Sequence, residues 1–206
     1  MSSTAEPRTV AFLGGRGSFS EEACQRLLPD CRAVPYPGFG AVAGAVLAGD
    51  CDVGVLPVRN TVAGPIEAAV ALAADPRLRT LSEGDLEVRF HLLGVAGSRI
   101  EQIRSVASHP AALSQCAAFI AKRGYPVEEA SSTSDAAREL VDAHDPSRGA
   151  IASLMAAEMY GLDVLARDIQ GAAANITSFA VIALAESVFK PDGITRQLGH
   201  RVTSET

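Results

Sequence analysis

Short apolar runs of strand length alternate along this chain with alanine-rich segments of helical period. This alternation is typical of an α/β protein with largely parallel strands. It predicts strands over residues 9–13, 32–35, 53–57, 86–96, 103–107, 127–130, 150–152 and 177–185. It predicts helices over residues 18–29, 39–48, 66–74, 111–123, 134–142 and 154–160.

The length of 206 residues is enough for one large domain or two small lobes. We predict an α/β domain over residues 8–190, with lobe 1 at about 8–84 plus 179–190 and lobe 2 at about 85–178. Two lobes of this size would place a cleft between them, where ligands commonly bind. The polar residues 191–206 indicate a loose C-terminal tail.

Charge and cysteine spacing exclude several classes of protein. A net charge of -6 argues against nucleic acid as a partner, because neutralising phosphates requires a basic face. The cysteines show no C-x-x-C pair, which favours free cytosolic thiols over a metal site or a disulfide framework. With neither an apolar leader nor a run of membrane-spanning length, we predict a cytoplasmic protein without a membrane partner.

A glycine-rich turn follows the first predicted strand and opens a helix at residues 14–20. Glycines there allow backbone N–H groups to approach an anion, and the helix N-terminus adds positive potential. A dinucleotide fingerprint is disfavoured, because its third glycine is replaced by Ser20 and no acidic residue ends the next strand. A loop that binds a small anion or hydroxyl and a purely structural turn both remain open.

Polar residues elsewhere give weaker signals. No histidine pair has the spacing of a metal site on a helix face, and for His91 and His109 a structural role is favoured over catalysis. The absence of a G-x-S-x-G elbow disfavours a serine hydrolase. The segment 131–135 predicts a helix N-cap, and its hydroxyls and free N–H groups are equally suited to holding a carboxylate.

Taken in chain order, these segments resemble the catalytic domain of prephenate dehydratases from about Thr9 to Leu184. The resemblance rests on six ordered motifs, each of which would be weak alone. The motifs lie at residues 13–23, 56–64, 108–116, 132–137, 150–162 and 175–179.

The resemblance implies two lobes of periplasmic-binding-protein-like (type II) architecture with the active site in the cleft between them. It also implies prephenate as the substrate, no cofactor and no metal, and a homodimer or homotetramer. Family members usually carry a regulatory ACT domain, and this chain ends about where that domain would begin. We therefore expect no ACT domain.

Two motifs depart from the family pattern. This chain has Arg59-Asn60-Thr61 where the family typically reads Glu-Asn-Ser, and Thr177-Ser178-Phe179 where it typically reads Thr-Arg-Phe. An acid has become a base in one motif, and a base has become neutral in the other. An alternative interpretation is drift in an ordinary dehydratase.

The chemistry of prephenate indicates what such changes would do. Loss of carbon dioxide pushes electron density into the ring, and the position of one proton then selects the product. Protonation of the C4 hydroxyl releases water and gives an aromatic ring, whereas protonation of a ring carbon retains the hydroxyl. In the dehydratases, the threonine of the Thr-Arg-Phe motif is regarded as the group that helps the hydroxyl to leave.

Since Ser178 lacks the charged fork of arginine, we expect weaker assistance to that leaving group. The pattern resembles the non-aromatizing prephenate decarboxylases of antibiotic and other secondary-metabolite pathways, which form dihydro-4-hydroxyphenylpyruvate. Two alternatives remain open. One is a dehydratase that forms phenylpyruvate without ACT regulation, and the other is a noncatalytic module that binds an aromatic-pathway metabolite.

The resemblance also assigns residues to the site. We predict catalytic roles for Thr177, Arg59 and Asn60, with Arg59 holding a substrate carboxylate. Arg59 could instead be a solvated or ion-paired side chain, and several other residues could be helix caps, core aromatics or exposed polar residues. The predicted substrate-binding residues are Ser18, Phe19, Thr61, Gln115, Ser132, Thr133, Ser178 and Phe179.

Overall fold

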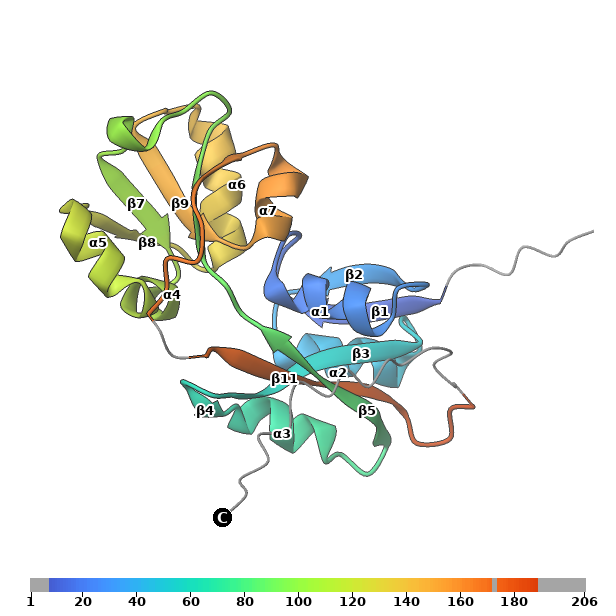
Figure 1. Cartoon of the computed structure of the whole chain (residues 1–206). Coiled ribbons are helices and arrows are strands. Elements are labelled where there is room, and N and C mark those ends of the chain that lie inside the picture. Colours follow the sequence, from blue (N-terminus) through green and yellow to red (C-terminus); the bar gives the residue numbers. More distant parts are fainter. Residues whose placement is uncertain (1–7, 172–173, 189–206) are drawn as a thin grey trace, which may run out of the picture. The chain divides into compact units, whose positions relative to one another are not determined.

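The computed structural model describes residues 8–171 and 174–188, which divide into two compact units (Figure 1). Unit 1 contains residues up to Leu13, residues 23–87 and residues from Ile176, and unit 2 contains residues 14–22 and 88–175. The two sheets make this a mixed α/β protein, as predicted. The expected tail at 191–206 lies outside the described residues.

Unit 1 is built on a sheet in the order β2-β1-β3-β11-β5, with β4 paired to β3 (Figure 1). Its parallel pairs are β1 with β2 and β1 with β3, whereas β11 runs antiparallel to both β3 and β5. The final strand therefore returns to the first sheet. The strands are β1 (Thr9–Leu13), β2 (Arg32–Tyr36), β3 (Val53–Asn60), β4 (Gly64–Pro65), β5 (Leu78–Glu87) and β11 (Ile176–Leu184).

Helix α2 (Phe39–Ala48) forms much of the core of unit 1. It is apolar almost throughout, and Gly49 ends it in the left-handed conformation at φ 79°. Its buried Val42 and Val46 pack with Leu56 of β3 and Ile182 of β11. The other helical elements of this part of the fold are α1 (Phe19–Leu27), whose first residues belong to unit 2, and α3 (Glu67–Ala73).

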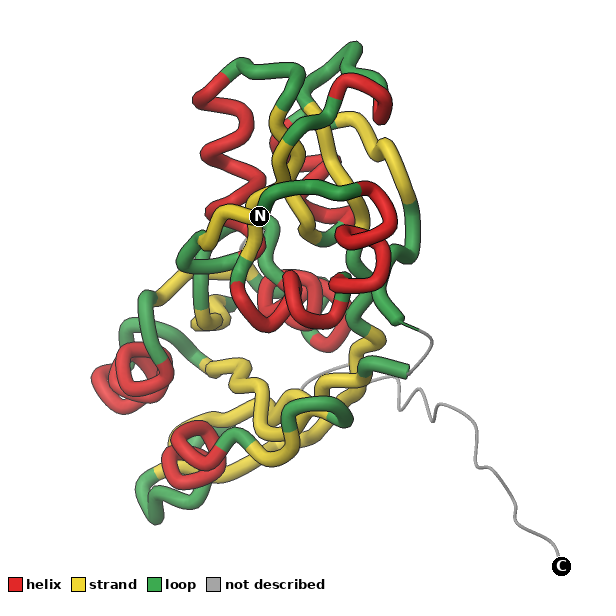
Figure 2. The backbone as a smooth tube through the Cα atoms, turned by 90° about the vertical axis from the view of Figure 1, so that its left-hand side faces the viewer, coloured by secondary structure: helices red, strands yellow, loops and turns green. Residues whose placement is uncertain are grey.

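Unit 2 has a second sheet in the order β10-β6-β9-β7-β8. Strand β7 pairs in parallel with β8 and β9, and β6 and β10 complete the sheet in antiparallel pairs. The strands are β6 (His91–Gly94), β7 (Ser105–Ser108), β8 (Val127–Glu129), β9 (Arg148–Ala152) and β10 (Asp163–Ala166). The helical elements are η1 (Ile100–Gln102), α4 (Pro110–Gln115), α5 (Ala117–Arg123), α6 (Thr133–Ala143) and α7 (Leu154–Tyr160), drawn as red coils in Figure 2.

The central strands of unit 2, β6, β7 and β9, are buried on both faces of their sheet. Adjacent residues such as Leu92 and Leu93, or Ala150 and Ile151, belong to different core clusters, because successive side chains of a strand point to opposite faces. One cluster includes Leu113 and Ile120 of α4 and α5, and the other includes residues of α6 and α7. Helices on both faces explain why these strands read as continuous apolar runs.

The structure corrects three predictions of elements. The long strand predicted over 86–96 is two strands in different sheets, because the chain passes between the units after Glu87. The helix predicted over 111–123 is interrupted at Cys116, whose φ of -99° and ψ of 9° leave the helical range. The sheets are mixed rather than largely parallel, and the short strand β10 was not predicted.

Among residues 8–171 and 174–188, no helix is both long and apolar enough to cross a membrane.

The buried histidine of β6 is held by a backbone contact. The N–H of Asp168 donates to Nδ1 of His91 over 3.2 Å, and burial lowers the pKa of His91 below its ordinary value of 6.5.

We predict that His91 makes folding acid-sensitive. The unfolded chain takes up a proton at His91 from about pH 6.5 downward, whereas the folded chain resists it, so stability should fall as the pH drops through and below that value. Urea denaturation between pH 7 and 5 should show a shallower loss for His91→Gln than for the wild type. Equal losses in the two proteins would contradict this assignment.

Candidate active site

Thr177 and Asn60 occupy directly opposed positions on β11 and β3. The backbone N–H groups of Val62 and Ala63 both donate to Oδ1 of Asn60 over 2.9 Å. This fixes the amide so that its Nδ2 donates to Oγ1 of Thr177 over 2.8 Å. Because Thr177 is the acceptor in that bond, its own hydroxyl hydrogen is left to donate elsewhere.

The backbone on both sides of this pair is firmly set. Thr61 and Ile176 form two hydrogen bonds, each of 2.9 Å. The N–H of Thr61 donates to the carbonyl oxygen of Ile176, and the N–H of Ile176 donates to Oγ1 of Thr61. Next to the Thr177–Asn60 pair, Ser178 lies opposite Arg59. The following residue, Phe179, lies opposite Pro57, so Val58 of β3 has no opposite residue on β11. This β-bulge is a common device for aiming side chains near a site.

Ser178 lies between two charged residues in one row across three strands. It is opposite Arg59 on β3 and opposite Asp85 on β5. Its hydroxyl donates to Oδ1 of Asp85 over 2.6 Å and accepts a longer bond of 3.4 Å from Nη2 of Arg59. The row therefore joins a cation and an anion through one small hydroxyl.

The two polar networks face opposite sides of the sheet. Thr177 and Ser178 are successive residues of one strand, so their side chains point in opposite directions. Thr177 shares its face with Asn60, and Ser178 shares the other with Arg59 and Asp85. The two departures from the family motifs are thus direct cross-strand neighbours, and Asp85, which the motifs did not indicate, accepts the hydrogen bond of Ser178 on the next strand.

Phe179 is 2% exposed and lies in the core of unit 1. Its predicted contact with substrate stays a prediction, as does the predicted role of Arg59 in holding a carboxylate. Thr177 is buried to a similar degree, at 8% exposed, which keeps water away from most of its surface.

The glycine-rich loop of unit 2 is locked by buried polar contacts. Glu21, which is 2% exposed, accepts hydrogen bonds from the N–H of Gly17 over 2.6 Å and from Nε of Arg16 over 2.7 Å. The hydroxyls of Ser153 and Tyr160 donate to the carbonyl oxygens of Gly17 and Arg16. Sequence reasoning did not assign Glu21 or Ser153 a role.

Three predicted polar residues act as helix caps. Ser18 Oγ accepts from the N–H of Glu21 over 3.3 Å, and Ser132 Oγ accepts from the N–H of Asp135 over 2.9 Å. His109 accepts from the N–H of Ala111 over 3.2 Å at the start of α4. Hydrogen bonds from the hydroxyls of Ser131 and Ser132 lower the pKa of Asp135.

Other predicted residues of unit 2 have identifiable neighbours. Oε1 of Gln115 accepts from Nδ2 of Asn175 over 2.6 Å, so Asn175, just before β11, orients that side chain. The ring of Phe19 packs edge-on against Phe90, with centroids 5.5 Å apart. Thr133 begins α6 next to the Ser132 cap. Within residues 8–171 and 174–188, no three His, Cys, Asp or Glu side chains are grouped to hold a metal ion.

The family model described as prephenate dehydratase matches residues 10–187 of this chain. The chain belongs to the prephenate dehydratase family. The sequence resemblance is thereby confirmed at the level of the family, and the matched span contains all of the candidate residues of both units.

Three family relatives illustrate the similarity. Arogenate dehydratase 2 of Petunia hybrida is 39% identical over 84% of this chain and 44% of its own length. A bifunctional N-acyl-homoserine lactone acylase/prephenate dehydratase of Komagataeibacter europaeus is 29% identical, over 90% of this chain and 66% of the relative. The prephenate dehydratase of Arthrobacter aurescens, solved in complex with L-Phe, has a TM-score of 0.79 at 26% identity, over 87% of this chain and 61% of that structure.

This prephenate dehydratase family chain spans under half the length of the petunia relative.

The loop that precedes α1 depends on one glycine. Gly17 has φ 78°, and a Cβ added there would lie 3.0 Å from Cα of Ala156. Both the conformation and the close approach therefore require glycine.

We predict that Gly17→Ala destabilises unit 2 more than Gly161→Ala does. Gly161 also has a positive φ, of 66°, but a Cβ there meets nothing within 4 Å. Both variants carry the conformational cost, and only Gly17→Ala adds overpacking, which typically costs about 1–3 kcal/mol. Urea denaturation of the two variants measures the difference. Equal losses would show that α7 yields to the added methyl group.

Proposed function

We propose that this chain is a lyase that converts prephenate to phenylpyruvate, carbon dioxide and water. The observation that carries the proposal is the Thr177 hydroxyl, held by Asn60 so that its hydrogen is available to a ligand. The family match and the name of the petunia relative support dehydration over the hydroxyl-retaining reaction favoured from the sequence.

The proposed reaction removes two groups from one ring. The bond between C1 and the ring carboxylate breaks and releases carbon dioxide. Its electron pair moves through the ring and expels the oxygen at C4, which leaves as water after taking up one proton. Thr177 donates a hydrogen bond to that departing oxygen, where negative charge develops.

Asn60 contributes in two ways. Its donation to Oγ1 of Thr177 draws electron density from the oxygen and strengthens the hydroxyl as a donor, as expected for a chain of hydrogen bonds. The bonds from Val62 and Ala63 keep the amide from rotating, so the hydroxyl direction is set before substrate arrives. Such preorganisation is effective because nothing must reorient during the reaction.

The remaining assignments are hypotheses from the sequence. Ser18, Phe19, Gln115, Ser132 and Thr133 remain predicted substrate-binding residues, and the active-site cleft between the lobes remains a prediction. So do the cytoplasmic location and the homodimer or homotetramer.

We predict that Thr177→Val lowers the rate of phenylpyruvate formation by about 10²–10⁴-fold, the usual contribution of a positioned proton donor. Valine keeps the shape of threonine and lacks the hydroxyl, whereas Thr177→Ser keeps the hydroxyl and should retain most activity. Ser178→Ala, on the opposite face, is the neighbouring control. Assays should use both prephenate and arogenate, the compound in the name of the petunia relative.

A near wild-type rate in Thr177→Val would remove Thr177 from the chemistry. A loss of the same size in Ser178→Ala would mean that the strand, and not the hydroxyl, determines activity.

A second candidate is the non-aromatizing decarboxylation of prephenate to dihydro-4-hydroxyphenylpyruvate. The observation that favours it is Ser178, a neutral residue beside Thr177 where family members typically carry arginine. Carbon dioxide leaves as before, a proton from solvent reaches a ring carbon, and the C4 hydroxyl is retained. A role in antibiotic or other secondary metabolism belongs to this candidate alone.

Incubation with prephenate in heavy water, followed by NMR, separates the candidates. Dehydration predicts phenylpyruvate without ring deuterium, whereas the hydroxyl-retaining reaction predicts a diene with one deuterium on the ring. Unchanged prephenate would instead support the noncatalytic binding module.

The variant Arg59→Glu with Ser178→Arg tests whether the altered motifs matter to the outcome. Because this pair lies on the face opposite Thr177, we expect the double variant to give the same product as the wild type. A switch of product in the double variant would instead assign these two residues to the selection of the reaction.

A further inference from the structure

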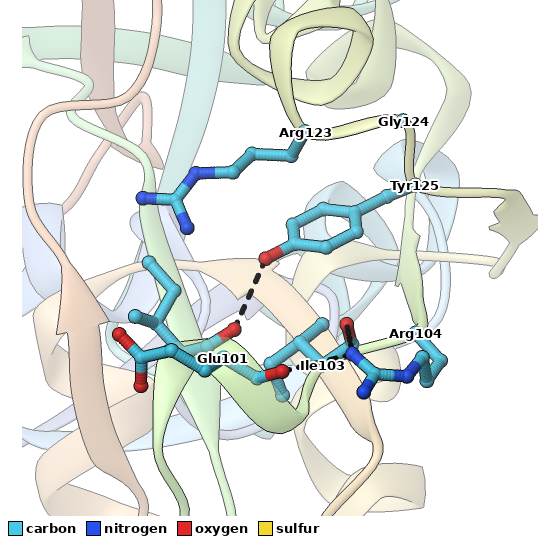
Figure 3. Close-up of a pocket in the computed structure, with 7 residues that line it drawn as sticks. Glu101, Ile103, Arg104, Arg123, Gly124 and Tyr125 are labelled. Carbon is cyan, nitrogen blue, oxygen red and sulfur yellow. Dashed lines mark hydrogen bonds between the residues drawn. The ribbon is translucent and has the colours of Figure 1, made fainter.

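Unit 2 contains a pocket of about 270 Å³ that none of the candidate active-site residues lines. Its walls come from two segments, residues 100–104 and residues 123–125. Figure 3 shows the Tyr125 ring reaching toward the segment that carries Glu101, Ile103 and Arg104, with the guanidinium groups of Arg123 and Arg104 on opposite sides of the ring.

The pocket lies at the amino ends of two parallel strands. Arg104 directly precedes β7 and Tyr125 comes just before β8. The predicted substrate contacts Ser132 and Thr133 follow the carboxyl end of β8. In α/β proteins, active sites gather at the carboxyl ends of strands, so this pocket is separate from the part of unit 2 that the proposed function uses.

Two guanidinium groups give the pocket its positive character. Nη1 of Arg104 donates to the carbonyl oxygens of Glu101 over 2.8 Å and Ile103 over 3.1 Å, which holds its planar fork in place. The Arg123 guanidinium lies 5.6 Å from the ring centroid of Phe119. Neither arginine has an acidic side chain within 4 Å among residues 8–171 and 174–188.

Apolar side chains, Gly124 and the carboxylate of Glu101 make up the rest of the lining. Ile103 is 2% exposed, and the Tyr125 hydroxyl donates to the carbonyl oxygen of Ile100 over 3.3 Å, which fixes the ring (Figure 3). Gly124, at φ 66°, presents backbone without a side chain between Arg123 and Tyr125. A ligand therefore meets cationic forks beside a fixed aromatic surface.

We propose that this pocket binds a small organic monocarboxylate, with its carboxylate on the Arg123 guanidinium and its apolar part against Tyr125, while Arg104 adds positive charge on the other side of the ring. Arginine forks match the geometry of a carboxylate. Two arginines and Glu101 give the lining a net charge of about +1, which suits a monoanion better than a phosphate dianion. The volume of about 270 Å³ lies just below the usual range for small-molecule sites, which favours a small ligand.

The test is an NMR titration of the full ¹⁵N-labelled chain with 3-phenylpropanoate, following the amide signals of Gly124 and Tyr125. Both residues line this pocket and neither is a candidate active-site residue, so the result can be read separately from any change at the proposed active site and does not depend on turnover. We expect saturable shifts of both signals. Their absence would overturn the proposal.

Variants of the lining sharpen the test. Arg123→Gln should weaken binding by about tenfold or more, since a charged hydrogen bond is lost. Lys122→Gln makes the same charge change one residue away, outside the lining, and should leave affinity within about twofold of the wild type, since a surface charge beyond contact range acts weakly. Glu101→Gln should tighten binding, because it removes a negative charge beside the carboxylate.

Two comparison ligands exclude simpler explanations. The neutral 3-phenylpropan-1-ol should bind more weakly, because it lacks the carboxylate. Inorganic phosphate should also bind more weakly, because it lacks the apolar part. Equal binding of either ligand, unchanged affinity in Arg123→Gln, or weaker binding in Glu101→Gln would overturn the proposal.

Discussion

The antiparallel pairing of β11 with β3 and β5 is the interaction on which the candidate chemistry depends. β11 comes from the C-terminal part of the chain, more than a hundred residues after β3, and it enters the middle of the unit 1 sheet. Seven of its nine residues are buried, so its register is strongly specified by the core. That register alone places Thr177 opposite Asn60 and Ser178 between Arg59 and Asp85.

The same pairing changes the meaning of the altered motifs. In the sequence alone, Arg59 and Ser178 indicate a reaction that retains the C4 hydroxyl, because each is next to a predicted catalytic residue. In the sheet they contact each other and an acid on β5, on the face that Thr177 does not share. A row of hydrogen bonds from Arg59 through Ser178 to Asp85 is therefore a sufficient local explanation, and it leaves the Thr177–Asn60 pair intact.

Much of the fold could be predicted from local pattern. β1, α2 and α7 have the predicted bounds, because clear apolar runs, or helices ended by Gly49 and Gly161, mark them. The break between β5 and β6 could not be predicted, since residues 86–96 are apolar enough to be one strand and only tertiary contacts divide them.

The candidate site was predictable only in part. The motifs correctly indicate residues that lie together in unit 1, such as Asn60 and Thr177. Asp85 lies outside the motifs, and Glu21 and Ser153 lie inside two of them without an evident role, because their importance depends on burial and on the partners that the fold gives them. Cross-strand neighbours of this kind follow from the register, which a single sequence does not display.

The unpaired Val58 has a consequence for how this region can change over evolutionary time. Side chains alternate between faces, so removing one residue from the end of β3 would turn Asn60 away from Thr177 without altering either residue. A substitution in β3 changes the contacts of one side chain. A one-residue deletion would move the side chains of both polar networks on β3 to the opposite face of the sheet. The length of this segment is thus under tighter constraint than its composition.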